Sequence, residues 1–564
     1  MKHCTINGLV FYHYFYYYFF KGRVTCTSFL KRHIERCPCK KAAVSILQST
    51  RPSKMSKQVD TNDSDKLKNL LTKWVASGFN SFRATEHQCL KDLVQFGVEI
   101  GFKYQSNVCI ENFWPGRKNI KEDAVKKAEN FKEYAKKTIE NCKETSCMSI
   151  TTDMWSDGVV RNSYIDVSVF YVEDFTMKHQ LIAFRHFPES HTADNILAKV
   201  GEIADEFKFD HMVVPYVTDS GVDIKAAFKN SGWYACLCHR LHTIISDAWS
   251  KTLEEDPEIR LTFEKMMNVR RTVKMSNDLG SKLPRKLPND SPTRMWTGLS
   301  AFFSAFNDSF DTIAELFSER NVDAPTDKKL IETVSSALQE FDFAFKGMQA
   351  ANLPTLHLAV INVAKLNKAI EKFPNKMKSF KKHVLHGLRQ KWVTEINNGH
   401  LLAIALHPNF KSLAILKSCD LLKAITVPNI ENLIIAIGDS IESTGEIVEI
   451  PAASPSQTVC EDFMDPLEQE EPQPIQTSNA VSEYRKFLSE KILNVYEDPL
   501  MYWRQSSHVN LKSIAASVFC IPVSSAEPER LNSAAGNSVT AMRNRLSPAT
   551  VEILVLLNEF FKNE

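Results

Sequence analysis

Two acidic residues, Asp153 and Asp219, follow similar apolar segments and could carry the chemistry of this chain. The segment CMSITTDMWSD (residues 147–157) predicts a short buried strand that ends on Asp153, and MVVPYVTDS (residues 212–220) predicts a second strand that ends on Asp219. A carboxylate beside a buried strand is costly to desolvate unless a positive group meets it. Two of them on neighbouring strands would form a cradle for a divalent cation, which prefers oxygen ligands.

Length and composition limit the class of protein. A chain of 564 residues exceeds one hydrophobic core, so about two to four folded units are expected. An apolar content of 43% and a charged content of 24% favour soluble globular structure. Residues 1–60 hold eleven Lys and Arg against two Asp and Glu, whereas residues 442–480 hold nine Asp and Glu and no Lys or Arg. A basic arm and an acidic loop are common in proteins that contact polyanions.

The thirteen cysteines form no repeated framework, which is typical of a reducing compartment. Within the basic segment 25–42, His33 and Cys37 lie one helical turn apart, a spacing that suits two ligands of one zinc ion. The upstream cysteine pair that would complete such a site is missing, so a basic helix with incidental thiols is the alternative. The aromatic segment 9–20 is too short to span a bilayer, and no membrane association is expected.

The order of predicted elements changes along the chain. Residues 63–146 show helical periodicity with Lys and Glu between the apolar positions. Strands are predicted at 147–153, 162–174, 177–187 and 212–219, with a helix at 193–207 before the last strand. Three successive strands, a crossover helix and a fourth strand is a ribonuclease H-like order. In that fold the first and fourth strands are neighbours, so Asp153 and Asp219 would face the same point.

The second half is predicted to be mainly helical. The region 251–440 has few strand candidates, and Leu299–Phe317 is one of its clearest amphipathic pieces. The acidic segment 442–480, with five prolines, predicts a disordered linker. Residues 481–564 return to an ordered pattern that ends in an amphipathic helix.

Five motifs together resemble a known family. They are TTDMWSD, VTDSGVDIKAAF, CLCHRLH, TRMWTGL and IPVSSAEPERLNSAAGNSVTAMRNRLSP, and in this order they resemble the transposases of the hAT superfamily, in particular the Hermes- and hobo-like members, over residues 25–564. The resemblance implies an α/β plus all-α protein. A ribonuclease H-like catalytic domain would be interrupted by a large helical insertion and preceded by a helical DNA-binding and dimerisation domain.

The implied domains follow the element pattern. They are an aromatic tail, disordered or derived from a wrongly assigned first exon (1–24), a truncated BED-type zinc finger with its linker (25–62), the DNA-binding and dimerisation domain (63–146), the first part of the ribonuclease H-like domain (147–250), the helical insertion with its acidic linker (251–480), and the C-terminal part with a dimerisation helix (481–564). Because the finger is incomplete, Zn²⁺ at His33 and Cys37 is doubtful.

The resemblance also assigns metal-binding roles. Asp153, Asp219 and Glu529 would be the three catalytic carboxylates that hold Mg²⁺ or Mn²⁺, with Glu527 as a rival for the third position. The rival exists because Pro528 precedes Glu529, whereas the family usually has Ser there.

Five further residues receive roles from the same resemblance. Cys236 and His239 match the family's CxxH signature and are interpreted as site architecture rather than a zinc site. His239 would contact DNA or shape the metal site, with a packed core histidine as the alternative. Trp296 would stack on a flipped base, with a buried structural tryptophan as the alternative. Arg294 would pair with a phosphate, although Met295 separates two residues that are usually adjacent in the family. Arg530 would also contact DNA.

The leading hypothesis is a nuclear cut-and-paste DNA transposase that uses two metal ions for strand cleavage and transfer, with hairpins on the flanking DNA. Its partners would be terminal inverted repeats, target DNA and further copies of itself, as a homodimer or higher oligomer. A domesticated, transposase-derived DNA-binding protein without catalysis is the alternative. A generic nuclease of the same fold is a third possibility.

Overall fold

A computed structural model describes residues 61–78, 82–104, 109, 114–145, 148–211, 214–288, 297–320, 323–444, 479–492, 494–540 and 545–563. The predictions for His33, Cys37, Arg294 and Trp296, for the aromatic tail, and for most of the acidic linker lie outside these residues. The chain divides into two compact units, Met1–Pro115 and Gly116–Glu564.

The first unit contains the helices α4 (Thr61–Gly78) and α5 (Gln88–Lys103) and the 3-10 turn η1 (Phe82–Glu86). His87 caps α5 by accepting a hydrogen bond from the backbone N–H of Cys89. No residue of α5 is buried, and Leu93, Phe96 and Phe102 are 60%, 53% and 89% exposed. The described part of this unit therefore exposes apolar side chains that an ordinary core would cover.

A five-stranded mixed sheet forms the centre of the second unit. Its strands are β1 (Met148–Ser156), β2 (Ser163–Glu173), β3 (Thr176–His186), β4 (Tyr216–Thr218) and β5 (Trp233–Ala235). The spatial order is β3-β2-β1-β4-β5, with β1, β2 and β3 antiparallel and β4 and β5 parallel to β1. The expectation that the first and fourth strands pair side by side is confirmed.

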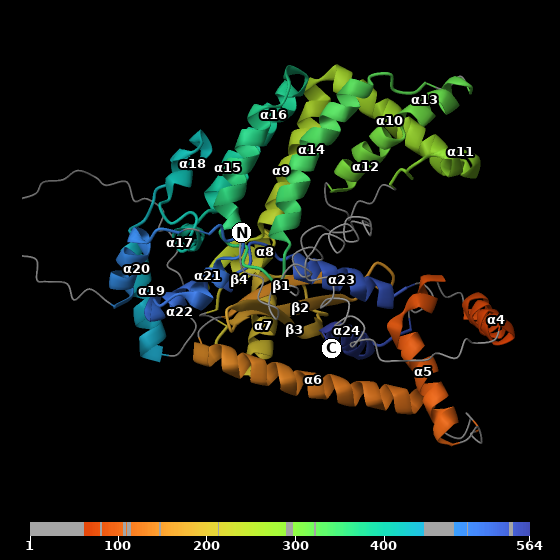
Figure 1. Ribbon diagram of the computed structural model, residues 1–564, viewed down its shortest axis with the longest axis horizontal. Coiled ribbons are helices and arrows are strands. Elements are labelled where there is room, and N and C mark those ends of the chain that lie inside the picture. Colours follow the sequence, from red (N-terminus) through yellow and green to blue (C-terminus); the bar gives the residue numbers. More distant parts are fainter. Residues whose placement is uncertain are drawn as a thin grey trace, which may run out of the picture. The chain divides into compact units, whose positions relative to one another are not determined.

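Alternation along the strands separates the two faces of the sheet. Ile150, Ile165 and Val167 face one core, which they share with α6 (Arg117–Thr145), α7 (Ala193–Phe207) and α8 (Val222–Ala227). The opposite face meets helices from the end of the chain, including α23 (Ala526–Ser538) and α24 (Pro548–Asn563). Figure 1 shows α6 running beneath the sheet. The helix α6 belongs to the second unit, although its sequence was grouped with residues 63–146.

A helical region joins β5 to the last part of the chain. Its elements are α9 (Leu237–Glu255), α10 (Pro257–Met275), α11 (Asn277–Lys282), α12 (Thr297–Asp308), α13 (Phe310–Ser318), α14 (Lys328–Met348), α15 (Leu358–Glu371), η3 (Asn375–Met377), α16 (Lys378–Gly387), η4 (Leu388–Trp392), η5 (Val393–Glu395), α17 (Asn398–Ala405), η6 (Ala414–Lys417), α18 (Asp420–Lys423) and α19 (Ile430–Thr444). Its long helices α9, α14, α15 and α16 share one large core and rise away from the sheet in Figure 1. After Ala235 the described residues contain no strand.

The chain then returns to the sheet. After α20 (Asn479–Ser489), α21 (Pro499–Gln505) and α22 (Val509–Phe519) come α23 and α24. In α24, Val551, Val555 and Leu556 are buried against the sheet and α23. The apolar face of this predicted dimerisation helix is thus occupied within the chain. The broad expectation of an α/β sheet combined with a mainly helical remainder agrees with the structure.

Three predicted boundaries were wrong. The strand expected at 212–219 is found only at Tyr216–Thr218 among the described residues. The first strand does not end on Asp153 but continues to Ser156, because β2 pairs with it as far as Ser156 and Ser163. The amphipathic piece Leu299–Phe317 is two helices that meet at Ser309. None of the helices that the structure describes is long and apolar enough to cross a membrane.

Candidate active site

The strand register brings Asp153 and Asp219 to the same level of the sheet. Ile150 pairs with Tyr216 and Thr151 with Val217, so two residues further along each strand lead to Asp153 and Asp219. Asp219 follows directly after β4. It accepts a hydrogen bond from the backbone N–H of Gly221 at 3.1 Å. The two strands therefore present two carboxylates side by side.

Asp153 is held by two hydrogen bonds. The backbone N–H of Met154 donates to its Oδ1 at 2.8 Å, and Nδ2 of Asn532 donates to its Oδ2 at 3.2 Å. Burial raises the pKa of Asp153 to about 7, and the charge of Asp219 adds to the rise, while the two hydrogen bonds oppose it. No cationic side chain of the described residues is among the groups that shift this pKa.

Glu529 reaches the same site from α23. This helix packs across β1 and β2, and Asn532 lies on it one turn after Glu529. Burial raises the pKa of Glu529 to about 7, and the charges of Asp153 and then Asp219 raise it further. Three carboxylates from distant parts of the sequence therefore lie close enough to repel one another.

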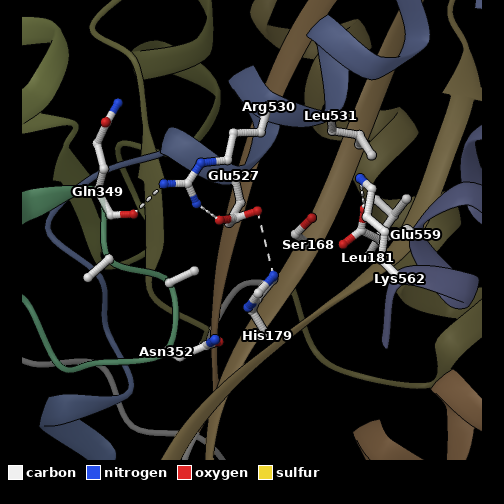
Figure 2. Close-up of a pocket in the computed structure, with 12 residues that line it drawn as sticks. Ser168, His179, Leu181, Gln349, Asn352, Glu527, Arg530, Leu531, Glu559 and Lys562 are labelled. Atoms are coloured by element: carbon white, nitrogen blue, oxygen red, sulfur yellow. Dashed lines mark hydrogen bonds and ion pairs between the residues drawn. The ribbon is translucent and has the colours of Figure 1, made fainter. Parts of the chain in front are cut away.

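Glu527, the rival for the third position, lies in a different environment. It forms an ion pair with Arg530, one helical turn away, and its Oε2 lies 3.5 Å from Nε2 of His179. Figure 2 shows these side chains around a cavity of about 390 Å³, where Arg530 also donates to the backbone oxygen of Gln349 at 2.7 Å. Of the two glutamates, Glu529 is the one that interacts with Asp153 and Asp219. Arg530 is placed in this cavity rather than beside the three carboxylates.

Cys236 and His239, the residues of the CxxH signature, follow β5. Cys236 lies between β4, which precedes Asp219, and the segment that leads into α23. Cys236 is fully buried, and its sulfur accepts a hydrogen bond from the backbone N–H of Ser525 at 3.3 Å. Burial raises the pKa of its thiol. The neighbouring Leu237 N–H donates to the carbonyl of Val523 at 3.0 Å. His239 is half-buried, with its ring 6.2 Å from that of His242. Cys236 therefore belongs to the contact between β4 and the segment that leads into α23.

Two residues of this region were missed by sequence reasoning. Asn532 orients Asp153, and its position three residues after Glu529, on the same helical face, could have indicated it. Asp166 lies directly opposite Asp153 on β2. It lies in the middle of the segment NSYIDVSVFYVED, which the sequence predicted as a strand without assigning a role to this aspartate. Burial, and next the charge of Asp153, raise the pKa of Asp166 well above its usual value.

Comparisons with known proteins agree with the motifs. Residues 483–561 match the model of the hAT family C-terminal dimerisation region. The chain is 24% identical, over 395 residues, to the Transposable element Hobo transposase of Drosophila melanogaster. That alignment covers 68% of this chain and 58% of the relative, so the chain spans less than two thirds of the relative's length. The two matches confirm the resemblance to hAT family transposases.

Proposed function

We propose that this chain is a DNA transposase of the cut-and-paste type, with its active site where β1, β4 and α23 meet. The observation that carries the proposal is that the carboxylates of Asp153, Asp219 and Glu529 lie close enough to repel one another. Among the described residues, no cationic side chain is one of the groups that shift the pKa of Asp153 or Glu529, so this repulsion is not offset. Such an arrangement is unfavourable for an isolated protein and typical of a functional site. The similarity to the Hobo transposase supports the same activity.

The donor set suits a hard divalent cation. All three side chains offer carboxylate oxygens, which Mg²⁺ and Mn²⁺ prefer, and a cation would relieve the repulsion among them. As placed in this structure, no three or more His, Cys, Asp or Glu side chains of the described residues stand in an arrangement that could hold a metal ion, so binding would have to draw the three carboxylates closer together. We therefore assign Asp153, Asp219 and Glu529 as the groups that would hold the metal. When bound, two such ions supply activation of the attacking oxygen and stabilisation of the leaving oxygen in phosphoryl transfer.

The residues of the chain provide positioning. Asp153 and Asp219 stand on adjacent strands of a sheet covered on both faces, which restricts their movement. Asn532 fixes the orientation of Asp153, and α23 carries Glu529 to the same point. The strand order supports a ribonuclease H-like assignment for this sheet. In this proposal Trp296 and Arg294 serve the flipped base and a phosphate during formation of the flanking hairpin.

The cellular setting is part of the proposal. The substrates would be terminal inverted repeats and target DNA, in the nucleus. A homodimer or larger assembly would use the region 483–561, which matches the family's dimerisation region. Since the apolar face of α24 is occupied within the chain, the subunit contact would use exposed apolar residues of this region such as Val495 and Val509, which are 85% and 70% exposed.

A cleavage assay tests the activity. The substrate is a supercoiled plasmid that carries the inverted repeats flanking the gene, incubated with the full chain and Mg²⁺ or Mn²⁺. We expect cleavage at the repeat ends, and loss of cleavage in Asp153→Asn and Asp219→Asn. The matched control is Asp498→Asn, because this partly buried aspartate caps α21 and asparagine can cap a helix equally well. Cleavage that persists in Asp153→Asn would refute the assignment, and DNA binding without cleavage by the wild type would favour the non-catalytic alternative.

A further inference from the structure

Asp166 is a fourth acidic residue beside the proposed metal site. It lies in the middle of β2 and pairs with Asp153 across the antiparallel register, so the two side chains leave the same face of the sheet. Its side chain is almost completely buried, with 1% of the residue exposed. Neither carboxylate oxygen has a hydrogen-bond partner among the described residues. The neighbouring Thr152 hydroxyl donates at 2.6 Å to the backbone carbonyl of Asp166 and not to its carboxylate.

A buried carboxyl group without partners is unfavourable for folding. Leaving a buried polar group unsatisfied costs about 1–3 kcal/mol, and more when the group is charged. Replacement of such a group by an apolar one of similar shape is often neutral or stabilising. Three other residues on the same face of β2 are also buried without a charge, Tyr164, Ser168 and Phe170, so uncharged side chains fit on this face. Folding alone therefore gives no reason for an aspartate at this position.

A third unpartnered oxygen belongs to Asn532, which contacts Asp153 from α23. Asn532 is buried, its Nδ2 donates to Asp153, and its Oδ1 has no partner among the described residues. Carboxylate and amide oxygens are both common ligands of hard divalent cations. Asp153 is thus flanked by two buried oxygen donors, one from β2 and one from α23, that nothing in the described protein satisfies.

We propose that Asp166 is an additional oxygen ligand of the divalent cation held by Asp153, either directly or through one water molecule. The inference rests on the proposed function, because it assumes a cation at Asp153. It adds a residue from a different strand to the three carboxylates of the family motif. The cation satisfies the oxygens that the fold leaves unpaired, and it explains an aspartate at a position where the packing would accept an uncharged side chain.

Binding of Mn²⁺ to the full chain, measured by electron paramagnetic resonance without DNA, tests this inference. We expect Asp166→Asn, which keeps the shape of the side chain, to weaken Mn²⁺ binding at least about tenfold, as loss of a direct or outer ligand commonly does. Asp498→Asn serves as the matched control and should bind Mn²⁺ like the wild type. Thermal unfolding without metal should show Asp166→Asn at least as stable as the wild type, because an amide is cheaper to bury than a carboxylate.

The outcomes separate this inference from the proposed function. If Asp166→Asn binds Mn²⁺ as well as the wild type while Asp153→Asn does not, the role of Asp166 is refuted and the proposed site stands. If the wild type binds no Mn²⁺, the metal site and this inference both fall. Asp166→Ser provides a second variant should the asparagine variant fold poorly. Cleavage adds a further readout: excess Mn²⁺ should restore activity to Asp166→Asn but not to Asp153→Asn.

Discussion

Gly399 is the position at which a single added methyl group should be most disruptive. This glycine lies in α17 and is buried against Tyr234 of β5, so the helical region touches the sheet through bare backbone here. A Cβ atom at residue 399 would overlap the Tyr234 hydroxyl oxygen and lie 2.9 Å from its ring carbon Cζ. The tyrosine ring cannot easily move, because Tyr234 is only 3% exposed.

Two opposing effects determine the result of Gly399→Ala. Alanine should favour the helix by up to about 1 kcal/mol relative to glycine. Overpacking of a tight contact costs about 1–3 kcal/mol, and occasionally more. Since the overlap here is severe, we expect the clash to exceed the helix gain, with a net loss of about 1–2 kcal/mol in the free energy of unfolding. Urea unfolding followed by tryptophan fluorescence measures this quantity.

Two control variants test whether the contact between Gly399 and Tyr234 causes the loss of stability. Gly347→Ala in α14 adds a Cβ that meets nothing within 4 Å, so it should leave stability unchanged or raise it slightly. Combining Gly399→Ala with Tyr234→Phe removes the overlapping hydroxyl, and the double variant should recover at least about 0.5 kcal/mol relative to additivity. If Gly399→Ala is as stable as the wild type, or if the two substitutions are additive, the contact is not as described.

Three further predictions concern other regions. Burial lowers the pKa of His407 to about 4, so between about pH 6.5 and pH 4 the unfolded state binds more protons than the folded state, and stability decreases as the pH is lowered. The wild type should lose about 2 kcal/mol of stability relative to His407→Gln between pH 7 and pH 5, and a constant difference would contradict the lowered pKa. Val509→Asp should dissociate the oligomer, which sedimentation experiments would detect as a lower mass. The control Leu261→Asp, at a 54% exposed position on α10, should leave the oligomer intact. If Val509→Asp has the mass of the wild type, Val509 does not lie in the subunit contact. Asn532→Ala removes the hydrogen bond that orients Asp153, so DNA cleavage should slow about 10–100-fold while binding of inverted-repeat DNA is unaltered. Full cleavage activity in this variant would show that Asn532 does not position Asp153.

The sheet could be predicted in large part because its strands alternate clearly. β-branched and aromatic residues mark β2 and β3, and the crossover helix α7 has the bounds expected from its apolar spacing. The pairing of β1 with β4 was expected because the order of elements resembles the ribonuclease H-like fold, in which the first and fourth strands are neighbours. The preference for Glu529 over Glu527 could not be decided from spacing, because it depends on which side of α23 faces β1.

Other features depend on tertiary contacts that no local pattern contains. The break at Ser309 arises where its hydroxyl donates to the backbone carbonyl of Arg285 and accepts from the Arg285 N–H, a contact across 24 residues. The amphipathic period continues through this point, so the sequence favoured a single helix. Asp166 was missed for a different reason: its significance comes from what faces it across the sheet, and from the partners that it lacks.

The hydrogen bond between Leu237 and Val523 means that the polypeptide leaves the sheet and rejoins it at nearly the same place. Between these residues, α17 and α22 pack back onto the sheet, whereas the helices α9 to α16 are, in topological terms, a side branch closed at its base. Its length and internal arrangement can therefore change during evolution without displacing Glu529 from the two aspartates. A shortened or exchanged branch should still allow the carboxylates to assemble, provided that the junction at Cys236 and Ser525 is kept.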